Sequence, residues 1–141
     1  MNPLWTTDGK GIVFRSGREG EFGSIYWKKA DGTGVVEQLL LDPGCFIAPY
    51  SWSEDGNTLA LFENTVSPLS GDIGILSIEA GAGRKALPKE KHFELEPQIS
   101  PDGKWIAYQS DESGQGEIYV RPFPDVVAPF SAQMELWFGT G

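Results

Sequence analysis

The sequence predicts an all-β fold made of three similar units, each with four short antiparallel strands. A Trp or Ile followed three residues later by Asp-Gly occurs three times, at Asp8-Gly9, Asp55-Gly56 and Asp102-Gly103, and successive copies are 47 residues apart. Glycine (18) and proline (10) together make up about a fifth of the 141 residues, which is typical of short strands joined by turns. A repeat of this length with four strands has the dimensions of a β-propeller blade. An ordinary β-sandwich is the alternative, but it does not need an evenly spaced motif.

Each unit is expected to follow the same order of strand, Asp-Gly hairpin, strand, polar loop, strand, turn and strand. The chain then forms a single domain, residues 1–141, with blades at about residues 1–47, 48–94 and 95–141. The expected strands are 3–5, 12–14, 24–27 and 35–41 in the first unit, 46–52, 58–62, 72–78 and 84–87 in the second, and 94–99, 105–109, 117–120 and 134–138 in the third. The repeat is clear to about residue 124 and weakens after it.

The repeated aspartate is interpreted as a turn residue and not as a member of a catalytic or metal-binding series. Glycine takes positive φ without a Cβ clash, and the Asp side chain can bond its own backbone, so the dipeptide favours a tight hairpin. Large aromatic residues also recur at equivalent blade positions and are predicted to form the core between blades. They are Trp5, Trp52, Tyr26, Tyr108 and Tyr119, and packing is favoured for Trp27 as well.

Composition limits the possible partners and locations. The net charge is −9, with no basic stripe, so nucleic acid is not expected as a partner and binding to an anionic membrane is disfavoured. No run of about 18 apolar residues predicts a membrane span. The N-terminal residues have neither the basic nor the apolar region of a signal peptide. Cys45 is the only cysteine, so no internal disulfide is possible.

The sequence predicts no enzyme, cofactor or metal site. No Gly-x-Ser-x-Gly elbow occurs. Cys45 and His92 could form a dyad, but a buried cysteine and a solvated loop histidine are the preferred interpretation. Asp111, Glu112 and Glu117 could surround a Ca²⁺ ion, but a solvated acidic loop is preferred and the EF-hand pattern is absent.

The loops on the face opposite the Asp-Gly hairpins are the expected binding surface. They are longer and differ in length between the units, and variable loops on a rigid scaffold commonly carry binding residues. The candidates for contacts are Arg18, Phe22, Phe46, His92, Phe93 and Asp111.

Over residues 3–124 the sequence resembles the TolB-type, WD40-like propeller repeat. The consensus of that repeat runs Pro-x-Trp-Ser-Pro-Asp-Gly, then a strand, then an Ile-Tyr strand. Its first part is matched by Pro49-x-x-Trp52-Ser53-Glu54-Asp55-Gly56 and Pro97-x-Ile99-Ser100-Pro101-Asp102-Gly103. The second part is matched by Ser24-Ile25-Tyr26-Trp27 and Glu117-Ile118-Tyr119-Val120. The Gly-His and Trp-Asp dipeptides of true WD40 repeats are absent. Residues 25–32 and 110–124 also resemble the propellers that follow the kinase domain in bacterial eukaryotic-like serine/threonine kinases, although no kinase motif occurs here.

These resemblances imply a sensing or protein-binding module. The leading hypothesis is a non-enzymatic propeller that binds a protein or peptide. The alternatives are an accessory propeller of a larger enzyme, such as a kinase sensor or the gating domain of a prolyl-oligopeptidase-type peptidase, and a propeller that binds a small ligand or Ca²⁺. Three blades do not close a ring of about four to eight, so we expect either a fragment or a homodimer with six blades. The chain as it stands would be cytoplasmic, and periplasmic if it is a fragment of a TolB-like protein.

Overall fold

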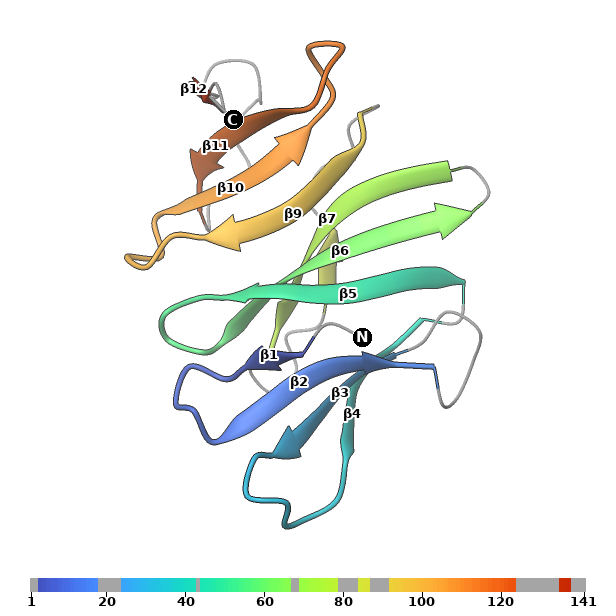
Figure 1. Ribbon diagram of the computed structural model, residues 1–141, viewed down its shortest axis with the longest axis vertical. Coiled ribbons are helices and arrows are strands. Elements are labelled where there is room, and N and C mark those ends of the chain that lie inside the picture. The colour runs from blue at the N-terminus through green and yellow to red at the C-terminus, as the bar shows by residue number, and fades with distance from the viewer. Residues whose placement is uncertain are drawn as a thin grey trace.

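The described part of the protein forms three four-stranded antiparallel sheets that follow one another along the long axis of the molecule (Figure 1). The computed structural model describes residues 3–17, 24–42, 44–66, 69–78, 84–86, 92–123 and 135–137. These residues contain no helix, and therefore none that could cross a membrane. The expectation of an all-β fold with four-stranded propeller blades is confirmed.

Within each sheet the spatial order of the strands is their order in the chain. The first sheet contains β1 (Leu4–Trp5), β2 (Gly11–Ser16), β3 (Ser24–Lys29) and β4 (Glu37–Leu41). The second contains β5 (Cys45–Trp52), β6 (Thr58–Val66), β7 (Leu69–Ser77) and β8 (Arg84–Ala86). The third contains β9 (Glu94–Ile99), β10 (Trp105–Ser110), β11 (Glu117–Pro122) and β12 (Glu135–Trp137). Strand β12 therefore lies inside residues 134–138, where the sequence predicts the last strand.

The three Asp-Gly hairpins share one hydrogen-bond network. In each, a hydroxyl two residues before the aspartate donates to its Oδ1, at 2.6 Å from Thr6, 2.5 Å from Ser53 and 2.5 Å from Ser100. The same Oδ1 accepts the backbone N–H two residues after the aspartate, at 2.9, 3.0 and 3.0 Å. The glycine that follows has a φ of 69, 73 or 71°. Because a side chain would be strained at that φ, the glycine and the hydroxyl together specify the turn.

Two apolar cores lie between the sheets. Strand β5 lies against the first sheet and β9 against the second, so each unit covers the face of the unit before it (Figure 1). The core between the first two sheets consists of Val13, Ile25, Cys45, Ile47, Leu59, Leu61 and Leu76. The core between the second and third sheets consists of Ala60, Ile73, Ile99, Ile106, Tyr108, Tyr119 and Phe123. Tyr26 is buried as well, and Trp27 and Trp52 pack against the first core.

A buried polar cluster stabilises the face of the third sheet that meets the second. Arg121 Nη2 lies 3.0 Å from Glu94 Oε1, and Arg121 Nε donates to the Tyr108 hydroxyl at 3.0 Å. The Tyr119 ring stacks on the Tyr108 ring with 6.1 Å between centroids. Burial raises the pKa of Tyr108, so this hydroxyl stays protonated and can accept from the guanidinium. The positive charge of Arg121 is therefore matched within the same sheet.

The two outer faces of the stack carry apolar residues that no further sheet covers among the described residues. Ile118 occupies the register position that Ile25 and Ile73 hold in the other two sheets; it is 38% exposed whereas they are fully buried. Trp105, on the same outer face, is 46% exposed. On the first sheet Trp5 is 60% exposed, so the expectation that it lies in a core between blades is wrong for this structure. Its equivalent Trp52 is covered because another sheet precedes it.

Candidate functional site

Two of the candidate loop residues lie in a row of aromatic rings. Phe62 joins Phe46 to Phe93, with centroids 6.2 and 6.3 Å apart. The Arg15 guanidinium carbon lies 4.0 Å from the centre of the Phe46 ring, so this row also contacts the first sheet. A Cβ on Gly71 would lie 2.5 Å from the Phe93 ring, which shows how closely that ring packs. These aromatic side chains are engaged in joining the sheets.

The remaining loop candidates are partly described. Asp111 Oδ1 accepts the backbone N–H of Phe93 at 2.8 Å, and the Asp111 N–H donates to the Phe93 carbonyl at 3.4 Å. His92 is half-buried beside Phe93. Arg18 and Phe22 lie outside the described residues. The structure thus brings Phe46, Phe93 and Asp111 together through local packing, and their role in binding stays a prediction.

The catalytic and metal alternatives gain no support from the described geometry. Cys45 is buried, and its thiol donates to the carbonyl of Asn64, with Sγ 3.3 Å from the oxygen. Glu117 accepts from the Gln115 amide at 3.0 Å, so it already has a partner in the protein. Among the residues the structure describes, no three His, Cys, Asp or Glu side chains are grouped so as to hold a metal ion.

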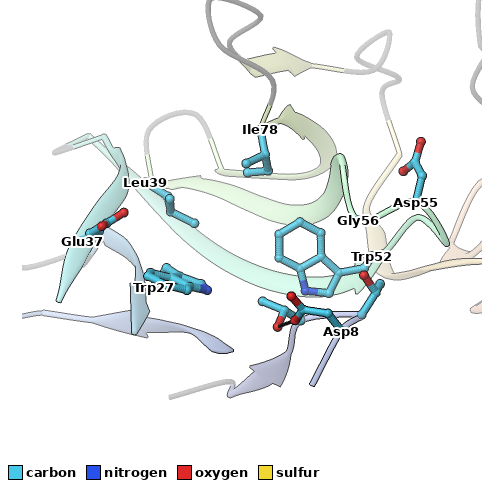
Figure 2. A pocket seen from close by; sticks show the side chains of 10 residues that line it. Asp8, Trp27, Glu37, Leu39, Trp52, Asp55, Gly56 and Ile78 are labelled. Carbon is cyan, nitrogen blue, oxygen red and sulfur yellow. Dashed lines mark hydrogen bonds between the residues drawn. The ribbon is translucent and has the colours of Figure 1, made fainter. Parts of the chain in front are cut away.

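The hairpin face, opposite the predicted loop face, has a groove where the first two sheets meet (Figure 2). We call it the inter-blade groove. It encloses about 420 Å³. It is lined by Thr6, Thr7, Asp8, Trp27, Glu37, Leu39, Trp52, Asp55, Gly56 and Ile78. These residues come from both hairpins, from β3, β4 and the end of β5, and from the residue after β7.

Strand register and one glycine position the first indole. Trp27 on β3 pairs with Val13 on one side and with Glu37 on the other, so the indole and the Glu37 carboxylate extend from the same face of the sheet. A Cβ on Gly11 would lie 2.2 Å from Trp27 Nε1, so the indole lies directly over the Gly11 backbone. Only a residue without a side chain fits beneath this ring.

The second indole is provided by the following unit. Trp52 is the last residue of β5, immediately before the second hairpin. Its Nε1 is buried and has no hydrogen-bond partner in the described part of the chain. Ile78 lies beyond the end of β7, and its N–H donates to the Asn57 carbonyl at 2.8 Å. Figure 2 shows the Trp27 and Trp52 side chains on either side of the groove, with Asp8 near its edge.

The groove is acidic at its rim. Asp8, Glu37 and Asp55 are exposed and line it, and no Lys or Arg is among the described residues that do so. The hydrogen bond from Thr6 lowers the pKa of Asp8, and the one from Ser53 lowers the pKa of Asp55; backbone N–H groups act in the same direction. Both side chains are therefore negatively charged at neutral pH. An adjoining hollow of about 450 Å³ shares Asp8 and Trp27 and contains Lys10 and Lys29.

Sequence reasoning did not find this groove. It assigned Asp8 and Asp55 to turns and the tryptophans to the core, and it gave no role to Glu37, Leu39 or Ile78. The repeat itself could have indicated part of the groove, because equivalent Asp-Gly hairpins on neighbouring blades lie at the same end of the sheets. The pairing of Trp27 with Glu37 was not available from the pattern, since a β-bulge between β3 and β4 sets it.

Comparison with known proteins identifies the fold. No protein-family model matches the chain. It superposes on the putative TolB from Agrobacterium tumefaciens with a TM-score of 0.75 at 22% identity, covering 90% of this chain and 43% of that one. It superposes on TolB from Acinetobacter baumannii with a TM-score of 0.72 at 26% identity, covering 89% and 30%.

Two peptidases are also similar. A prolyl endopeptidase structure matches with a TM-score of 0.65 at 13% identity, covering 96% of this chain and 21% of that one. The uncharacterized peptidase YuxL of Bacillus subtilis (strain 168) is 22% identical over 159 aligned residues, covering 84% of this chain and 24% of the peptidase. The chain thus spans less than half the length of each of these proteins. It has the fold of a TolB-like β-propeller, of which the described residues form three blades.

Proposed function

We propose that this chain is a non-enzymatic propeller module that binds a protein or peptide in the inter-blade groove. The observation that carries the proposal is a groove of about 420 Å³ with an indole on each side, formed where the first two sheets meet. Its volume lies within the range of about 300–1,000 Å³ that is common for ligand sites. Tryptophan is also enriched among residues that dominate binding energy, because it buries a large area with few rotatable bonds.

Selection from a random peptide library on the immobilised chain tests this proposal. Enriched peptides are expected to shift the backbone amide resonances of Asp8, Gly56 and Ile78 in an NMR titration. Ile78→Lys places a long side chain at the rim of the groove and should abolish binding. Val35→Lys is the matched control, because Val35 is 77% exposed and does not line the groove. Peptides that bind equally to both variants, or no enriched peptide at all, would overturn the proposal.

A second candidate function is an accessory propeller of a larger enzyme. The match to two peptidases supports it, since the chain spans 24% of one and 21% of the other. The kinase-sensor version is supported by the sequence motifs at residues 25–32 and 110–124 only. Sequencing the transcript on both sides of this chain distinguishes the versions. A Gly-x-Ser-x-Gly motif would support the peptidase version, kinase motifs would support the sensor version, and neither would count against both.

We also propose that the two open outer faces bind each other in a homodimer with six blades. The outer face of the third sheet, with Ile118, is equivalent to the face that the first and second sheets each turn toward the following sheet. The outer face of the first sheet, with Trp5, is equivalent to the face that the second and third sheets each turn toward the preceding sheet. Ile118→Glu should then convert the dimer to a monomer in light scattering, whereas Val35→Glu should not. A wild-type chain that is folded and monomeric at micromolar concentration would contradict this assembly.

A further inference from the structure

We propose that the inter-blade groove takes a cationic side chain, lysine or arginine, from its peptide partner. This inference rests on the proposed function and specifies its ligand. The occupant is chosen by charge complementarity and by the aromatic walls, which are separate properties of the same groove.

The first property is the charge at the rim. Three exposed carboxylates, those of Asp8, Glu37 and Asp55, line the groove, and no described lining residue is cationic. They come from three different elements, namely the two hairpins and β4. A cation inside the groove therefore meets negative charge from several sides, whereas an anion would be repelled.

The second property is the pair of indoles. A cation is attracted to the face of an aromatic ring, and tryptophan gives the strongest attraction of the three aromatic residues. Trp27 and Trp52 belong to different sheets and both line the groove (Figure 2). Leu39 and Ile78 add apolar surface suited to the methylene groups of a lysine or arginine.

The adjoining hollow limits where in the groove the ligand cation can sit. Lys10 and Lys29 lie there, next to Asp8 and Trp27, and partly balance the charge of Asp8. The negative charge of Glu37 and Asp55 lies outside that hollow. We therefore expect the ligand cation to sit between the two indoles and away from Lys10 and Lys29, with Glu37 toward the Trp27 side and Asp55 toward the Trp52 side (Figure 2).

The test uses short capped peptides in place of an unidentified partner. The probes are acetyl-Gly-Arg-Gly-amide, acetyl-Gly-Lys-Gly-amide and the neutral acetyl-Gly-Gln-Gly-amide, titrated into the isotope-labelled chain. The readout is the indole N–H resonance of Trp27 and of Trp52. The cationic peptides should shift both resonances, with weaker binding as salt concentration rises, and the glutamine peptide should shift neither.

Glu37→Gln provides the sharpest variant, because it removes one charge from an exposed groove residue while keeping the side-chain shape. It should weaken binding of the cationic peptides about two- to fivefold, the range typical of one exposed ion pair. Glu54→Gln is the matched control, since Glu54 is also exposed, is adjacent to Asp55 and does not line the groove. Equal dissociation constants for the two variants would overturn the inference.

The outcomes separate this inference from the proposed function. If library peptides bind in the groove but carry no positive charge, or if the glutamine probe binds as well as the arginine probe, the cationic ligand is wrong and the peptide-binding function stands. If arginine and lysine probes differ in affinity, the tighter one identifies the preferred residue and supports the inference. If neither library peptides nor cationic probes bind, both proposals fail.

Discussion

Replacing Gly56 by alanine tests how closely consecutive blades pack. Gly56 has a φ of 73°, and a Cβ built on it would lie 2.7 Å from Thr7 Oγ1 of the preceding hairpin. The equivalent glycines, Gly9 at 69° and Gly103 at 71°, have nothing within 4 Å of such a Cβ. The three positions therefore share the backbone strain, and only Gly56 adds a contact between blades.

The expected losses in the free energy of unfolding follow from the backbone strain at positive φ and from the contact with Thr7. A side chain at this φ costs about 1–2 kcal/mol, and the lower unfolded-state entropy of alanine returns about 0.5–1 kcal/mol. Gly9→Ala and Gly103→Ala should then lower the free energy of unfolding by about 1 kcal/mol each. Gly56→Ala should lower it by about 1 kcal/mol more, the lower end of the range for overpacking, because the Thr7 hydroxyl can rotate away.

Urea unfolding of the three variants measures this difference, and a double-mutant cycle identifies its origin. Thr7→Ala removes the clashing oxygen, so Gly56→Ala should cost less in that background, with a coupling of at least about 0.5 kcal/mol. If Gly56→Ala is no worse than the other two substitutions, or if the coupling is absent, the inferred contact between the hairpins is wrong.

Three further predictions concern the buried cluster, the backbone and pH. Glu94→Ala should lower the free energy of unfolding by about 3–5 kcal/mol in urea, because it leaves the Arg121 charge buried without the carboxylate 3.0 Å away; a loss no greater than that of Glu94→Gln would contradict this. Glu96 has a φ of 52°, so Glu96→Gly should raise the thermal midpoint and Glu96→Ala should not; equal midpoints would argue against strain there. Hydroxyl hydrogen bonds are the main cause of the lowered pKa values of the hairpin aspartates. The stability that their ionised carboxylates give the folded protein is therefore complete above the ordinary carboxylate pKa, and it is lost as pH falls through the lower folded-state pKa. Ser53→Ala should reduce that acid-dependent loss in pH-dependent unfolding, and an unchanged pH profile would oppose the assignment.

The repeat was enough to predict the sheets, because local chemistry specifies them. Asp-Gly, a preceding hydroxyl and an apolar run together define a hairpin whose partners lie within a few residues. The prediction for Trp5 was wrong for a different reason. The prediction treats equivalent residues of the repeats as equally buried, which requires every sheet to have a neighbouring sheet on both faces. Among the described residues, no sheet covers the outer face of the first sheet.

The candidate site was harder to predict because it depends on contacts between units. Phe46 and Phe93 were chosen for their place in variable loops, yet each packs against Phe62. The inter-blade groove depends on the register of Glu37 with Trp27 and on the absence of a side chain at Gly11. A pattern within one unit does not contain that information.

The stacking of the sheets has a consequence for local unfolding. Of the three described sheets, the second is covered on both faces, by the first sheet and by the third. In the single chain, which is a linear array of sheets, stability is carried by contacts between nearest neighbours, so the end units open at lower free energy than the second sheet. Amide hydrogen exchange should therefore be slowest in β6, where Leu59, Ala60 and Leu61 are fully buried. The inter-blade groove has one wall on an end unit, so its opening can precede global unfolding.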